Sequence, residues 1–152
     1  MESLRIERKD IYTIEVNDQG ETIEFDLVDI ELPFKCDKAF KEVERIKSEL
    51  KAKLVIIDKK QDRKIKGSIM TANEEARINA YKEAYIAMRS AMDVFLGDGA
   101  CQKIFGDRNY LEMFADLAEA LAPHLEKMEI SASGIAKRIE AKYGKNEDGV
   151  LK

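Results

Sequence analysis

The spacing of the apolar residues changes at about residue 37, and this change restricts the chain to a mixed α and β architecture. Before that point apolar and polar residues alternate, as the series Tyr12, Ile14 and Val16 illustrates. A period of two is typical of a half-buried strand. After that point apolar residues recur at steps of three and four, which is typical of an amphipathic helix. We therefore predict an α+β fold, with an N-terminal antiparallel β-hairpin over residues 1–33 and a mainly α-helical body of four to five helices.

Two alternating runs, over residues 11–16 and 23–32, predict the strands of the hairpin. Residues 17–20, with the sequence Asn-Asp-Gln-Gly, have the composition of a turn. In the second run the alternation shifts by one residue, which predicts a β-bulge near residues 27–28. Pro33 is expected to close the hairpin, because proline cannot donate to a strand ladder.

Two long helices are predicted next. The first begins at about Asp37 and ends at about residue 60 or 64, and its apolar stripe is Phe40, Val43, Ile46, Leu50, Leu54 and Ile57. The second is predicted over residues 72–96, because Thr71 and Glu74 match a capping box and Gly97 is a typical end signal. Its expected inner face consists of Tyr81, Ala84, Tyr85, Met88, Met92 and Phe95.

Shorter helices complete the predicted body. A helical turn lies within the glycine-bracketed residues 97–106, and a longer helix is expected after Asn109, with Glu112 as its capping partner. Pro123 is expected to bend or interrupt that helix. A last helix is predicted over residues 134–143. The inner stripe expected for the helix after residue 109 is Leu111, Phe114, Leu117, Ala118, Leu121 and Leu125.

The length of 152 residues suits one compact domain. We predict a single domain over residues 1–144, made of the hairpin (1–33) and the helical body (34–144), and a flexible tail over residues 145–152. No apolar run approaches the ~20 residues that a membrane span requires, so we expect no membrane partner. The first residues lack the layout of a secretion signal, and a cytoplasmic location is expected.

The residues that could carry chemistry are few and scattered. A zinc site needs three or four clustered ligands, whereas the chain has one histidine, His124, and two distant cysteines, Cys36 and Cys101. His124 is a candidate general base without a suitably spaced nucleophile, so a structural role is favoured. Cys101 opens a short helix, where a thiol can be activated, but a small buried apolar role is favoured. The glycines within 97–106 follow a helix and lack a Gly-Lys-Ser/Thr motif. We therefore expect a non-enzymatic protein without catalytic residues, cofactors or metals.

Charge is distributed unevenly, although the net charge is only −4. Residues 1–34 hold 3 basic and 10 acidic residues, whereas residues 35–66 hold 12 basic and 6 acidic ones. These regions either attract each other or face solvent within one molecule, or they favour self-association or an acidic partner. Nucleic acid is not an expected partner, because the basic segment lacks interleaved aromatic residues and the rest of the chain is acidic.

The run from Ala91 to Asn109 has a helix ending in Phe-Leu-Gly, then a glycine-bracketed turn ending in Ile-Phe-Gly, then an asparagine before a further helix. This pattern resembles the tail assembly chaperones of long-tailed bacteriophages and of prophages in Gram-positive bacteria. Residues 24–33, an acidic strand before a charged helix, are similar to the opening of such proteins. The resemblance covers about residues 20–128 and consists of apolar and glycine positions.

The resemblance implies a role in the cytoplasm of the bacterial host. Such chaperones bind the long, helical tape-measure protein, keep it soluble and help to recruit tail-tube subunits. The candidate protein-interaction residues, from the shared turn and the methionine stripe before it, are Met88, Met92, Phe95, Leu96, Ile104 and Phe105. The alternative is a structural phage protein retained in the virion, such as a head–tail connector or tail-terminator subunit. A third possibility is a small enzyme that uses His124 and scattered acids.

Overall fold

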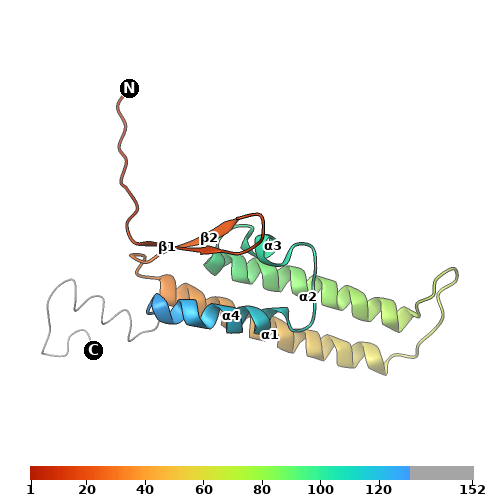
Figure 1. The fold of residues 1–152 in the computed structure, drawn as a ribbon. Coiled ribbons are helices and arrows are strands. Elements are labelled where there is room, and N and C mark those ends of the chain that lie inside the picture. The colour runs from red at the N-terminus through yellow and green to blue at the C-terminus, as the bar shows by residue number, and fades with distance from the viewer. Residues whose placement is uncertain (131–152) are drawn as a thin grey trace, which may run out of the picture. The chain divides into compact units, whose positions relative to one another are not determined.

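A computed structural model describes residues 1–130 and has the predicted α+β fold, with an N-terminal antiparallel hairpin followed by helices (Figure 1). The elements are β1 (Ile11–Glu15), β2 (Thr22–Asp26), α1 (Leu32–Lys59), α2 (Ala72–Leu96), α3 (Ala100–Phe105) and α4 (Met113–Lys127). The helix predicted over residues 134–143 and the tail predicted over 145–152 lie outside the described residues. No helix within residues 1–130 combines the length and the apolar content needed to cross a bilayer.

The chain divides into two compact units, which we describe separately. The first contains residues 1–36 and the chain from residue 102 onward, and the second contains residues 37–101. The expectation of a single domain over residues 1–144 stays a prediction.

The hairpin of the first unit forms as its alternation predicts. β1 and β2 pair antiparallel, with Ile14 opposite Ile23. The turn between them is held by the side chain of Asn17, which accepts hydrogen bonds from the backbone N–H groups of Gln19 and Glu21, and Gly20 adopts a φ of 78°. This left-handed conformation is one that glycine adopts without a steric penalty.

The prediction for the end of the second strand was wrong. β2 ends at Asp26, so there is no bulge at residues 27–28, and α1 begins at Leu32 rather than at Asp37. The side chains of Asp26 and Asp29 accept backbone N–H bonds two residues further on, and such Asx turns end a strand. Pro33 lies in the first turn of α1, where a backbone N–H has no acceptor within the helix. Because proline lacks only a group that would be unbonded there, Pro33 begins a helix instead of closing the hairpin.

The two long helices of the second unit follow their local signals. α1 ends at Lys59 and α2 spans Ala72–Leu96, as predicted, and the two helices run side by side in opposite directions (Figure 1). Apolar residues of both stripes are buried, among them Val43 and Leu50 on α1 and Met88 on α2. The end of α2 is formed by Gly97, whose φ is 110° and whose N–H bonds the carbonyl of Asp93.

Helix α4 of the first unit differs from its prediction both at its start and at Pro123. It begins at Met113, several residues beyond Asn109, and Glu112 makes no side-chain capping bond. Leu111 precedes the helix and is exposed, whereas Phe114 is buried as predicted. Pro123 does not interrupt α4, which continues to Lys127. The missing N–H of one exposed proline removes a single hydrogen bond, and here the remaining contacts of the helix outweigh that loss.

Candidate interaction surface

The structure places most of the predicted interaction residues in the interior. Met88, Met92, Phe95 and Leu96 are buried, so a partner could reach them only if the surrounding structure opened. Two further predicted residues are half-buried, namely Ile104 and Phe105. The ring of Phe105 contacts the rings of Tyr110 and Phe114 edge to face, at centroid distances of 6.2 and 6.1 Å.

His124 makes a contact that ties two elements of the first unit together. Its Nδ1 lies 2.8 Å from the hydroxyl oxygen of Tyr12, and the two rings meet edge to face at 5.8 Å. Tyr12 lies on β1 and His124 on α4, so the hydrogen bond joins the hairpin to the helix. This contact is the structural role favoured for the histidine, because it stabilises a link between residues 112 positions apart.

Cys101 is a buried thiol, as the favoured interpretation predicts. Its side chain is 1% exposed, and burial, followed by the hydrogen-bonding contact with Asp93, raises the pKa of the thiol to about 12. The thiol therefore stays protonated near neutral pH, and the start of α3 does not activate it. Cys36 is also buried, and neither cysteine is in a disulfide.

No cluster of three metal-ligating side chains occurs within residues 1–130. A shallow depression of about 140 Å³ between α1 and α2 has charged groups at its wall, including Arg45, Glu49, Lys53 and Glu83. These groups pair with one another in solvent: Arg45 contacts Glu49, and Lys53 lies 3.5 Å from Glu83. Exposed, mutually paired charges of this kind are typical of a solvated helix surface.

The best candidate for an interaction surface is the end of the α1–α2 hairpin, which we call the tip and define as residues 55–78. It contains the end of α1, the loop and the start of α2. Four large apolar side chains of the tip are exposed, namely Val55, Ile56, Ile69 and Ile78. Ile69 is fully exposed at the loop, so its apolar surface faces solvent. Exposed apolar side chains that gather in one region are typical of protein interaction sites.

The part of the tip between residues 59 and 66 is basic, with five basic residues and one acid. Its exposed basic side chains between residues 59 and 66 are Lys59, Lys60, Arg63, Lys64 and Lys66. In the part of the chain that the structure describes, none of these five forms an ion pair. The surface therefore combines unpaired positive charge with exposed apolar groups.

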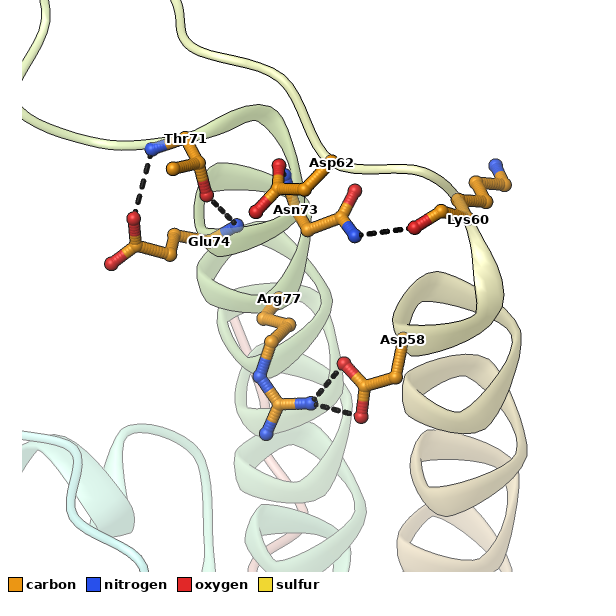
Figure 2. Close-up of polar contacts among 7 residues, drawn as sticks. All are labelled: Asp58, Lys60, Asp62, Thr71, Asn73, Glu74 and Arg77. Atoms are coloured by element: carbon orange, nitrogen blue, oxygen red, sulfur yellow. Dashed lines mark hydrogen bonds and ion pairs between the residues drawn. The ribbon is translucent and has the colours of Figure 1, made fainter.

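Two acids of the tip, Asp58 and Asp62, have structural partners (Figure 2). Arg77 donates from Nη1 to both carboxylate oxygens of Asp58 at 2.8 Å, which joins α2 to α1. Asp62 accepts the backbone N–H of Asn73 at 2.9 Å, and this bond is the main cause of a lowered pKa for its carboxyl group. These carboxylates thus bond groups other than the lysines of the tip.

The loop itself is held in one conformation by hydrogen bonds at both of its ends (Figure 2). The side-chain amide of Asn73 donates to the carbonyl of Lys60 at 2.9 Å. Thr71 and Glu74 form the predicted capping box, in which each backbone N–H donates to the side-chain oxygen of the other residue. An isolated bridge between Lys64 and Thr71 adds backbone pairing inside the loop. Ile69 is thus presented by an ordered loop.

The capping box makes a testable contribution to stability. Thr71→Ala is expected to lower the free energy of unfolding by about 1 kcal/mol, because it leaves the N–H of Glu74 without its acceptor. The measurement is urea unfolding followed by circular dichroism. Ser90→Ala, at an exposed position inside α2, is the matched control and should change stability by less than about 0.5 kcal/mol. Equal effects of the two variants would contradict the capping role.

The tip was not predicted from the sequence, although the sequence contains signals for it. Residues 59–66 contain five basic residues and a single acid, and Ile69 stands in a loop marked by Gly67 and Ser68. Periodicity directs attention to the buried stripes instead, since it reports which side chains face inward.

The described residues thus define an α+β chain that exposes apolar and basic side chains at its tip. The chain belongs to a family of unknown function (DUF6673), because the model of that family matches residues 19–148. No curated protein and no solved structure matches the chain.

Proposed function

We propose that this chain is a non-enzymatic tail assembly chaperone of a long-tailed bacteriophage or prophage, and that its tip binds a helical segment of the tape-measure protein. The resemblance of residues 91–109 to such chaperones motivates the proposal. The matched family is described without a function, so the tape-measure protein and the tail-tube subunits enter as proposed partners.

One observation carries the proposal: exposed isoleucines and unpaired cations share an ordered tip. Ile56 and Ile78 lie on the two helices and Ile69 lies in the loop between them. An amphipathic client helix could bury its apolar side against these residues. Acidic side chains beside that apolar stripe would pair with the lysines and would also raise the rate of association. Many weak contacts along a long client would then add up through avidity.

The experiment is co-expression with the proposed client, to be sought as a long, coiled-coil-rich reading frame immediately downstream. Ile69→Asp is expected to reduce the soluble client that co-purifies by about tenfold, since it places a charge within the apolar contact. Val94→Asp, at an exposed position on α2 outside the tip, introduces the same charge and should leave capture unchanged. Both variants should fold, because both side chains face solvent.

Two results would overturn the proposal. The first is equal capture of the client by Ile69→Asp and by the unmodified chain. The second is a stoichiometric amount of the chain in purified virions by mass spectrometry, because an assembly chaperone leaves the finished tail. That second result would favour the connector or terminator alternative.

A further inference from the structure

Residues 1–9 form an exposed arm that belongs to no helix or strand. Leu4 and Ile6 are 91% and 86% exposed, and they stand two positions apart between polar residues. This alternation is the pattern of a strand with one apolar face. The arm leads away from the hairpin (Figure 1), and Asp10, at a φ of 53°, lies between it and β1. A left-handed conformation at a residue other than glycine bends the chain sharply.

The outer edge of β1 is open in the part of the chain that the structure describes. Leu27 donates its N–H to the carbonyl of Asp10, and Val16 donates to that of Glu21, so the even-numbered residues of this strand bond to β2. The backbone groups of Ile11, Thr13 and Glu15 must then point away from β2. Within residues 1–130 these outward groups have no hydrogen-bond partner.

The outer edge of β2 differs, because α3 reaches it. Lys103 donates from Nζ to the carbonyl of Thr22 at 3.0 Å, and Asn17 donates to the carbonyl of Lys103 at 3.0 Å. Of the two edges, the one on β1 is therefore the better site for an added strand. Open edges of this kind pair readily with other chains.

We propose that residues 1–9 of one copy pair with the outer edge of β1 in a second copy, and that the two copies exchange arms reciprocally. The arm continues directly into β1 through Asp10 and does not fold back onto that strand. A two-stranded sheet is marginal in water, and an added strand strengthens it. A reciprocal exchange closes into a symmetric dimer.

The distribution of charge also favours the arm of a second copy as the strand that is added to the edge of β1. The arm carries three basic residues, Arg5, Arg8 and Lys9, and two acids, Glu2 and Glu7, whereas residues 10–26 carry six acids and no base. Arg8 already lies 3.0 Å from Glu24 in this structure. Apolar alternation, free backbone groups and opposite charge thus occur together on the arm and on the edge. The proposal does not depend on the tip or on any client.

The test uses two complementary variants, examined by analytical ultracentrifugation. One variant lacks residues 2–9 and keeps the edge, and the other, Thr13→Pro, keeps the arm but removes an outward N–H that β2 does not use. Each alone should self-associate with a Kd at least about tenfold weaker than that of the unmodified chain. An equimolar mixture should form a heterodimer, because the arm of one variant can use the edge of the other.

A third variant keeps the test decisive if Thr13→Pro misfolds. Leu4→Ser combined with Ile6→Ser keeps the length and charge of the arm, and it should weaken self-association while leaving the circular dichroism spectrum unchanged. Undiminished dimerisation of the chain that lacks residues 2–9 would overturn the proposal. A monomeric unmodified chain at every concentration would overturn it too, whether or not the tape-measure client binds.

Discussion

Phe25→Ala is expected to lower the free energy of unfolding by about 3–5 kcal/mol, the range found when a buried aromatic ring is removed and leaves a cavity. Phe25 lies on β2 opposite Tyr12, and only 1% of its side chain is exposed. Close-packed interiors relax incompletely after such a deletion, so lost contacts add to the lost burial. Urea unfolding followed by circular dichroism measures the change.

Phe34→Ala provides the matched control. The same ring is removed near the start of α1, but there 65% of the side chain is exposed. We expect a change of less than about 0.5 kcal/mol, because little apolar surface is returned to water. If both variants lost the same stability, the burial of Phe25 would not be the source of its effect.

The second large effect is a loss of stability in alkaline solution that depends on Cys101. Burial raises the pKa of this thiol from 9.0 to about 12 on folding. Between those values the unfolded chain has lost the proton while the folded chain keeps it, so the unfolded state binds fewer protons. Stability must then fall as the pH rises, by about 1.4 kcal/mol per pH unit from this group. The contribution is complete below pH 9.

Cys101→Ala isolates this dependence, because the other titrating groups are shared by both proteins. The free energies of unfolding of the two proteins should differ by a constant amount below pH 9. From pH 9 to pH 10.5 the unmodified chain should lose about 2 kcal/mol relative to the variant. Cys36→Ala keeps the Cys101 thiol and should follow the unmodified chain. A difference between the unmodified chain and Cys101→Ala that is independent of pH would show that the thiol titrates normally in the folded protein.

The sequence predicted the long helices well where the signals were local. The ends of α2 are decided by the capping box of Thr71 and Glu74 and by Gly97, and all of these act within one helical turn. The end of β2 was harder to predict, because Val28 and Ile30 continue an apolar alternation but are exposed. Asp26 and Asp29 bond the backbone at the same place, and this turn chemistry overrides the alternation.

The candidate site was predictable only in part. The stripe that contains Met88 and Met92 was recognised, but such a stripe identifies residues that are buried, and these two are. The basic tip was visible as a run of lysines and arginines, whereas its significance depends on Asp58 bonding Arg77 and on Asp62 bonding Asn73. In those pairings the two carboxylates bond groups other than the lysines, and sequence spacing does not reveal this.

The sequence by itself determined the order of strands and helices, the ends of α2 and the separation of acidic from basic segments. These depend on periodicity, capping and charge, which act over a few neighbouring residues. Only the tertiary structure decided that Tyr12 would meet His124, that Lys103 would bond the outer edge of β2, and that the outer edge of β1 would have no partner within residues 1–130. Such outcomes require residues far apart in the chain to be brought together, and the energy of each contact depends on the packing around it.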